Sequence, residues 1–192
     1  MVATRISVAE FEASCGDERV ELVDGEIIPM SPSADESSSI GWMIGYLLGL
    51  HVVPRKLGRL YNAEAGFVLF PDRATVRVPD VAFVRADRMP SGEARRHFVN
   101  VPPDLAVEVH SPSDRPRDIA RKAAMYQQAG VPLVWLVDPD TRTVSVLALG
   151  QEPVTLTGLP QRVAVTLGNA QLALNVSSEI RGFGTAALST CN

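Results

Sequence analysis

Apolar residues recur every three or four positions over residues 36–53, and this spacing predicts a helix. Its apolar positions are Ile40, Met43, Ile44, Leu47 and Leu50. A second helix is expected over residues 116–129, because Pro116 suits a first helical turn and Gly130 a C-terminal stop. A shorter helix is expected to open with the capping box of Ser7 and Glu10 and to end near Gly16.

Alternating apolar and polar residues predict short strands elsewhere in the chain. Asp24-Gly25 lies between two such runs in residues 19–30 and predicts a hairpin, because both residues tolerate positive φ. Residues 54–60 are expected to form a linker. The other expected strands span residues 64–70, 75–84, 104–110, 133–137, 143–149 and 163–167.

The order of these elements predicts an α/β (α+β) fold. A mixed β-sheet flanked by helices would follow an N-terminal helix and β-hairpin. The chain has 192 residues and no internal repeat, which fits one domain. We expect that domain to span residues 1–183, with residues 184–192 as a flexible tail.

Gly41, Gly45 and Gly49 lie four residues apart and therefore line one narrow strip of the first long helix. Each glycine lowers helix stability by about 1 kcal/mol relative to alanine. The strip indicates that another element approaches closely. Packing within the chain is the favoured interpretation, and a subunit contact is the alternative.

Composition narrows the class of protein. Charged residues make up 21% and hydrophobic residues 46% of the chain, which is typical of a globular protein. The 18 Lys+Arg against 22 Asp+Glu leave a net charge of −4, which argues against coating nucleic acid through bulk positive charge. The cations nevertheless concentrate locally, at Arg88, Arg95, Arg96, Arg115, Arg117, Arg121 and Lys122.

Cys15 and Cys191 are the only cysteines, so reduced thiols in a cytoplasmic setting fit better than a disulfide framework. The N-terminus lacks the apolar segment of a signal peptide. The longest apolar stretch, residues 40–53, is too short to span a bilayer. We therefore expect a soluble cytoplasmic protein without a membrane partner.

Two carboxylates, Asp80 and Glu108, lie inside apolar strand patterns. A carboxylate on a half-buried strand is unfavourable unless a cation lies beside it. A partly exposed strand end or an ion pair would satisfy either residue alone. Both, however, have a small alanine as a neighbour on their own face, which leaves room for an ion with its waters. Paired carboxylates suit Mg²⁺.

The helix that follows Glu108 offers a cation. With Ile119 as the inward reference and 100° per residue, Tyr126 and Ala123 face inward, and Lys122 lies on the flank of the buried face. From there its ammonium group can reach a site over the sheet. The alternative is a lysine whose stem only covers apolar surface.

Four segments in this order resemble the Uma2 family of endonuclease-like proteins, within the PD-(D/E)XK restriction-endonuclease-like superfamily. They are ELVDGEI at residues 21–27, VPDVAFV at 78–84, DLAVEVHSPSD at 104–114 and KAAMYQQAGVPLVWLVDPDTRTV at 122–144. The resemblance covers roughly residues 5–175 and implies a helix, a three-stranded meander, a helix and a returning strand.

The resemblance also implies roles for individual residues in metal binding and catalysis. Asp80 and Glu108 resemble the family's metal-binding acids, and the backbone carbonyl of Val109 would be a further ligand. The superfamily lysine normally follows two residues after the acid, where this chain has His110. In Uma2-like chains it has moved to the next helix, which indicates Lys122.

Three more residues are candidates for a place beside this set. Glu21 and Glu64 are candidate additional acids, and a structural role, or one supporting the ligands, is favoured for His110. Relatives often carry a histidine near the start of the long helix, where this chain has Ser37, Ser38 and Ser39, and this departure puts activity in question.

Two functions remain. The first is a Mg²⁺-dependent endonuclease, with Mn²⁺ as a substitute, that hydrolyses phosphodiester bonds in DNA and acts as a homodimer by analogy with other nucleases. The alternative is a catalytically inactive nuclease-fold module that binds nucleic acid or mediates oligomeric contacts. A Gly-x-Ser-x-Gly nucleophile elbow, a phosphate-binding loop and zinc-ligand spacing are all absent from the sequence.

Overall fold

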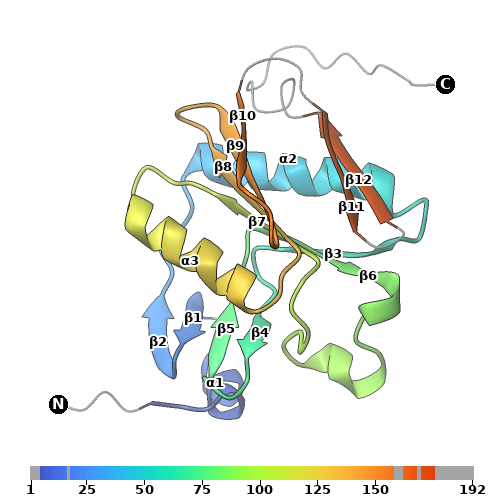
Figure 1. Cartoon of the computed structure of the whole chain (residues 1–192). Helices are drawn as coiled ribbons and strands as arrows, with labels where there is room; N and C mark the ends of the chain where they lie inside the picture. The colour runs from blue at the N-terminus through green and yellow to red at the C-terminus, as the bar shows by residue number, and fades with distance from the viewer. Residues whose placement is uncertain (1–4, 17, 158–161, 168–169, 176–192) are drawn as a thin grey trace.

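A six-stranded mixed sheet forms the centre of the molecule in the computed structural model, which describes residues 5–16, 18–157, 162–167 and 170–175 (Figure 1). β7 and β8 are parallel, whereas the other neighbouring pairs are antiparallel. Parallel strands need a crossover, and α3 (Pro116–Gln128) supplies it. The strand order is β10 (Val154–Thr157), β9 (Thr143–Ala148), β8 (Leu133–Asp138), β7 (Leu105–Val109), β6 (Val81–Arg85) and β3 (Gly58–Asn62). The expected α+β class with a mixed sheet is confirmed.

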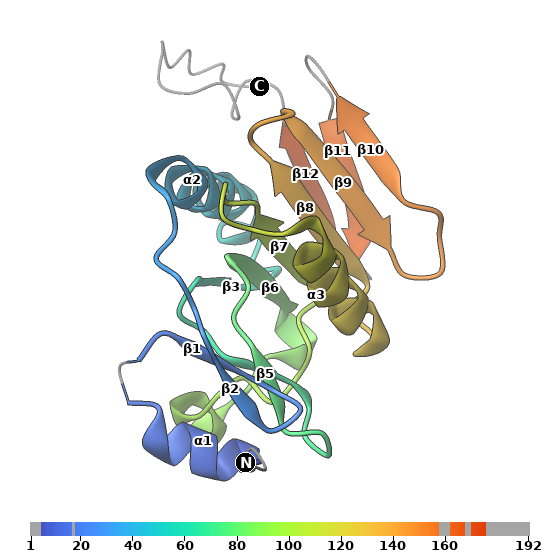
Figure 2. The same ribbon diagram turned by 90° about the vertical axis from the view of Figure 1, so that its left-hand side faces the viewer.

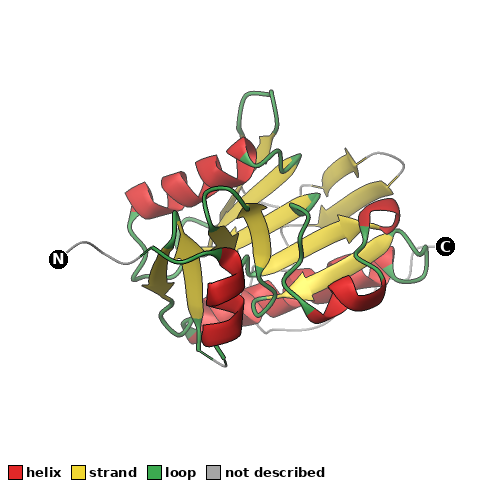
Figure 3. Cartoon of the chain, turned by 90° about the horizontal axis from the view of Figure 1, so that it is seen from below, coloured by secondary structure: helices red, strands yellow, loops and turns green. Residues whose placement is uncertain are grey.

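Two helices cover opposite faces of this sheet, α2 (Asp35–Val52) and α3 (Figure 3). Successive strand residues point to opposite faces, so β6 and β7 each contribute to both cores. Val81, Phe83, Leu105, Val107 and Val109 pack in the core of α2, whose Ile40, Ile44 and Leu48 are buried. Ala82, Val84 and Ala106 pack with Ala123 and Tyr126 of α3.

A smaller four-stranded sheet lies beside the central one (Figure 2). Its order is β2 (Glu26–Pro29), β1 (Val20–Val23), β5 (Thr75–Arg77) and β4 (Phe67–Phe70). The helix α1 (Val8–Ser14) packs against it through Phe11, which contacts the core of Leu22 and Val76. The predicted capping box at Ser7 and the β1–β2 hairpin are both confirmed, and Asp24 and Gly25 have φ of 51° and 82°.

The expected strand over residues 75–84 is wrong in one respect that concerns the site. It is two strands, β5 and β6, which belong to different sheets and are separated at Val78-Pro79-Asp80. Pro79 has no N–H group and cannot donate to a strand ladder, so pairing stops there. Asp80 therefore lies at a break before β6 and not inside a strand.

The expected linker over residues 54–60 is also wrong at its end, because β3 begins at Gly58 and pairs with β6 along its whole length. β3 is an edge strand with half-buried side chains, so its sequence shows little alternation. Residues 64–66 precede β4, which begins only at Phe67.

Further elements join these. The 3-10 helices η1 (Ala86–Arg88) and η2 (Gly92–Arg96) precede β7, and β11 (Arg162–Leu167) pairs with β12 (Ala170–Asn175). The pattern at residues 163–167 thus predicts β11, whereas β10 and β12 carried no recognisable pattern. The expected tail and Cys191 lie outside the described residues.

The glycine strip of α2 faces the sheet, as intramolecular packing requires. A Cβ atom built on Gly41 would lie 3.8 Å from the Cβ of Asp80, and one on Gly45 would lie 3.8 Å from a methyl of Val81. The strip therefore brings α2 close to the start of β6. No helix in the described part of the chain is long and apolar enough to cross a bilayer.

We expect Gly58→Ala to destabilise the protein and Gly45→Ala to leave it unchanged or stabilise it by up to about 1 kcal/mol. A methyl group on Gly58 would overlap the Val84 carbonyl oxygen, whereas one on Gly45 would make only van der Waals contacts. Urea unfolding of both variants measures the difference. Equal stability of the two variants would contradict this account of the packing.

Candidate active site

Asp80 is held at the end of the β6–β7 ladder by the main chain of Val109. The pairing of these strands begins at Val81 and Val107, so Val109 lies beyond it. The N–H of Val109 donates to Oδ2 of Asp80 at 2.7 Å. Among the described residues, nothing donates a hydrogen bond to the other oxygen, Oδ1. An extended residue directs its N–H and C=O toward the same edge, so the Val109 carbonyl faces the Asp80 side as well.

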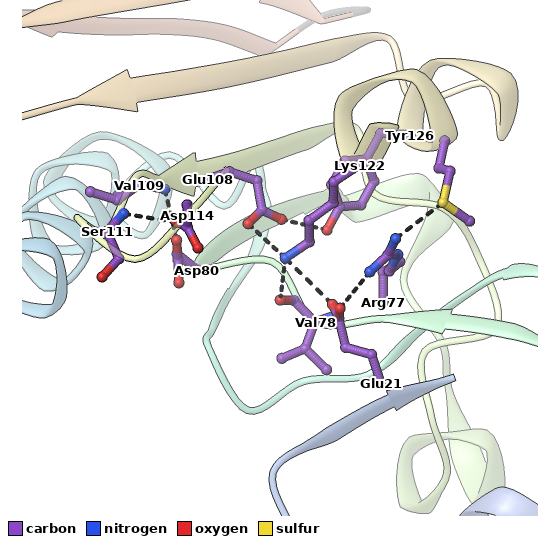
Figure 4. Close-up of polar contacts among 11 residues, drawn as sticks. Glu21, Arg77, Val78, Asp80, Glu108, Val109, Ser111, Asp114, Lys122 and Tyr126 are labelled. Atoms are coloured by element: carbon purple, nitrogen blue, oxygen red, sulfur yellow. Dashed lines mark hydrogen bonds and ion pairs between the residues drawn. The ribbon is translucent and has the colours of Figure 1, made fainter. Parts of the chain in front are cut away.

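Glu108 projects from β7 toward α3, where two side chains bind its carboxylate (Figure 4). Nζ of Lys122 donates to Oε2 at 2.7 Å, and the hydroxyl of Tyr126 donates to Oε1 at 2.7 Å. Lys122 and Tyr126 lie four residues apart on α3, so both reach the same side of the sheet. The predicted position of Lys122 on the flank of the buried face is confirmed, since its side chain is 20% exposed.

Glu21 of β1 joins this group from the smaller sheet. Its Oε1 lies 3.4 Å from Nζ of Lys122 and accepts a 2.9 Å hydrogen bond from the N–H of Val78. Its Oε2 accepts from Nη1 of Arg77 at 2.5 Å. Lys122 also donates to the Val78 carbonyl at 3.5 Å, so its ammonium group joins β1, β7 and the segment before Asp80.

Burial and neighbouring charges shift the pKa values of these groups in different directions. Burial raises the pKa of Glu108 to about 7, Lys122 opposes this rise, and the charges of Asp80 and Glu21 add to it. Burial also raises the pKa of Asp80, against the hydrogen bond from Val109. Burial would raise the pKa of Glu21 too, but Lys122 and Arg77 outweigh it and lower the pKa.

Lys122 keeps its charge in this environment. Burial alone would lower the pKa of its ammonium group, but the carboxylates of Glu108 and Glu21 outweigh burial and raise the pKa. The site therefore contains a permanent cation at neutral pH beside an acid, Glu108, that is poised between its two protonation states.

A cleft of about 960 Å³ opens onto the site and is bounded by α2 and β3 among other elements. Asp80, Val78 and Gly41 line it, whereas Glu108 and Lys122 do not. Glu108 is covered by its own partners, with a side chain that is 12% exposed. Asp80 is thus the carboxylate that a molecule in the cleft meets first.

The donor set fits a hard cation such as Mg²⁺. In the described residues, no three His, Cys, Asp or Glu side chains converge as a preformed metal cage. Asp80, Glu108 and the Val109 carbonyl provide oxygen donors only. Mg²⁺ is commonly bound by one or two carboxylates with several waters, so oxygen donors of this number suit it better than Zn²⁺.

The other predicted residues differ in whether they contact the group around Lys122. Glu21 joins the Lys122 group, whereas Glu64 is exposed on the wall of the cleft and makes no contact with that group. His110 donates its main-chain N–H to Val137, and its Nε2 is buried without a partner among the described residues. Ser37 is buried at the start of α2, where its hydroxyl bonds the Ala34 carbonyl.

Three neighbours of the site were not recognised from the sequence. Arg77 and Tyr126 bind Glu21 and Glu108, and the charge of Asp114 adds to the rise in the pKa of Asp80. Asp114 accepts a 2.8 Å hydrogen bond from the N–H of Ser111 in the turn after β7. Its place in the Ser-Pro-Ser-Asp turn that begins three residues after Glu108 was the available signal. Arg88, by contrast, is committed to buried Asp104 at 2.7 Å.

We expect Glu21→Gln to lower the free energy of unfolding by about 3 kcal/mol, because it leaves Arg77 as a buried cation without its counter-charge. Urea unfolding measures the loss. The double variant Glu21→Gln with Arg77→Met removes both charges and should recover most of the stability. A double variant no more stable than the single one would contradict this interpretation.

We expect the metal-free protein to lose stability as pH rises from about 4.5 to about 7 through Glu108. The folded state binds the Glu108 proton more tightly than the unfolded state does. The stabilisation from this proton is therefore complete below the ordinary pKa of 4.5 and is lost as the pH rises through the raised pKa of about 7. Urea unfolding in EDTA at several pH values measures this slope. Glu108→Gln should flatten it, and the exposed control Glu93→Gln should not. Identical slopes in all three proteins would contradict the raised pKa.

Comparison with known proteins identifies the fold and the family of this chain. The Uma2 family, described as "Putative restriction endonuclease", matches residues 8–177. A crystal structure of "a putative nuclease belonging to DUF820" from Anabaena variabilis ATCC 29413 has the same fold. Its TM-score is 0.73 at 21% sequence identity, and the match covers 91% of this chain and 97% of that one. No curated protein matches the sequence. Because the family match spans most of the chain and includes the segments that carry Glu21, Asp80, Glu108 and Lys122, this protein belongs to the Uma2 family.

Proposed function

We propose that this protein is a Mg²⁺-dependent endonuclease that hydrolyses phosphodiester bonds in DNA, with Mn²⁺ as a substitute ion. The observation that carries the proposal is that the Val109 N–H binds Asp80 while the preceding residue, Glu108, binds the ammonium group of Lys122. Family membership supports a nuclease, and the open cleft at Asp80 supports access for a large substrate.

Asp80, Glu108 and the Val109 carbonyl would hold the ion. When bound, Mg²⁺ supplies positive charge that polarises a phosphate and lowers the pKa of a water molecule. The rise in the pKa of Glu108 means that this group still holds a proton part of the time near pH 7. Ion binding therefore requires Glu108 to release that proton, so affinity for the ion increases with pH.

Lys122 would stabilise negative charge that builds up on the phosphate in the transition state. Its pKa is raised by Glu108 and Glu21, so it remains an ammonium group and does not serve as a base at neutral pH. Glu21 would position Lys122, because it binds the same nitrogen from the opposite side. Arg77 in turn keeps Glu21 ionised.

We expect purified protein to nick DNA with Mg²⁺ and to be inactive in EDTA. Asp80→Asn and Glu108→Gln should each lower the rate at least about 100-fold, because each removes an ion ligand worth several kcal/mol in the transition state. Lys122→Met should also cost about 100-fold. Gel assays of supercoiled DNA measure the rates, with Glu93→Gln as a matched control on an exposed carboxylate. Equal cleavage by all of these variants would show that a contaminating nuclease is responsible.

Thermal melting separates this proposal from the alternative of an inactive binding module. An ion that binds only the folded state raises the melting temperature. Millimolar Mn²⁺ should therefore stabilise the wild-type protein but not Asp80→Asn. The absence of both a shift and cleavage would favour the module. Homodimerisation and a cytoplasmic location remain predictions.

A further inference from the structure

An aromatic pair lies exposed on α2, beside the candidate active site. Trp42 and Tyr46 are separated by one helical turn, and their rings are stacked with centroids 5.5 Å apart and planes 5° from parallel. Trp42 is 67% exposed and Tyr46 is 48% exposed. Large aromatic rings usually gain more from burial than from solvent contact, so an exposed and ordered pair indicates a binding surface.

The pair lines the same cleft as Asp80. Gly41, the residue before Trp42, packs toward the Cβ of Asp80 with no side chain between them. The next residue on the helix is rotated by about 100°, which turns Trp42 away from the sheet and along the wall of the cleft. Ser38, Trp42 and Tyr46 follow one another at intervals of four, so this wall is a single face of α2.

The exposed apolar residues of α2 divide into two groups. Leu50 of α2 and Val53, the residue that follows the helix, are also exposed, at 54% and 69%, but neither lines the cleft. The aromatic residues of this helix therefore face the cleft that contains Asp80, and the exposed aliphatic residues do not. A surface that served only to join two copies of the chain would not require this separation.

The charges of the cleft show what these rings can bind. Among the described residues that line it, Arg19 is the single Arg or Lys, against Glu18, Glu64 and Asp80. Such a surface does not hold a polyanion through phosphate contacts alone. Stacking of bases on aromatic rings does not depend on net charge or on base identity.

We propose that Trp42 and Tyr46 form a stacking platform for an unpaired base next to the phosphate that reaches Asp80. The substrate would then be single-stranded DNA, or duplex with a locally unpaired segment, because bases inside a duplex already stack on each other. This inference rests on the proposed function and narrows its substrate class.

Intrinsic fluorescence tests the platform directly. The chain has two tryptophans, and Trp135 is only 1% exposed, so Trp42 supplies the solvent-sensitive signal. In EDTA, which prevents cleavage, a thymidine oligonucleotide of about 12 residues should quench this signal to saturation. An abasic strand with the same number of phosphates should not, and a blunt duplex of the same length should quench much less.

Variants test the same point by anisotropy of a labelled single strand. Trp42→Ala should raise the Kd for the single strand about tenfold or more, and Trp42→Phe should restore part of the lost affinity. Leu50→Ala, on the same helix, should bind like the wild type. Quenching of equal depth and affinity by duplex or abasic DNA would overturn the proposal. So would equal losses in Trp42→Ala and Leu50→Ala together with a lower mass in sedimentation, because the face would then join two copies of the chain.

The outcome for the platform can be separated from the outcome for the proposed function. Base-dependent quenching without any metal-dependent cleavage would support the platform and contradict the nuclease. Metal-dependent cleavage with the same KM for single strands and duplex, unchanged in Trp42→Ala, would support the nuclease and overturn the platform.

Discussion

The ammonium group of Lys122 holds the candidate site together, because it lies between the carboxylates of Glu108 and Glu21. These acids come from two different sheets, and Asp80 brings a third negative charge nearby. Without a cation the three would repel one another in a poorly solvated space. One lysine thus allows an acidic site to exist inside a folded protein before any ion binds.

Glu21, Asp80 and Glu108 also differ in their roles within the site. Glu21 is satisfied within the protein, with hydrogen bonds from Arg77 and Val78, and its lowered pKa keeps it charged. Asp80 has one oxygen that accepts no hydrogen bond from the described residues, and it lines the cleft. Glu108 lies between these two cases. Both of its oxygens accept hydrogen bonds, as those of Glu21 do, but its pKa is raised, as that of Asp80 is. The group that faces the cleft and the group that anchors the lysine are therefore distinct.

The sequence predicted those parts of the site that depend on local geometry. Lys122 follows from the 100° step of a helix, and Glu108 follows from alternation along β7. The contact between Glu21 and Arg77 could not be predicted, because the alternation of β1 and β5 does not reveal which strands pair. Asp80 was recognised from its chemistry, but it was placed inside a strand. In the structure, Pro79 and Asp80 lie between β5 of the smaller sheet and β6 of the central sheet. The edge strand β3 was missed because its half-buried side chains carry a weak pattern. Asp114 was missed because it lies in an exposed turn, where an acidic residue is common.

The hairpin of β1 and β2 makes the site depend on the contact between two sheets. Glu108 and Lys122 belong to one continuous β7–α3 unit, so their pair can form as soon as that unit does. Glu21 belongs to a hairpin whose outer strand, β2, is exposed and, among the described strands, pairs with β1 alone. Local opening of peripheral elements is easier than global unfolding, since fewer buried contacts are lost. Undocking of this hairpin would leave the central sheet intact but remove one of the two carboxylates that hold Lys122. The electrostatic balance of the site therefore depends on a strand that lies outside the central sheet.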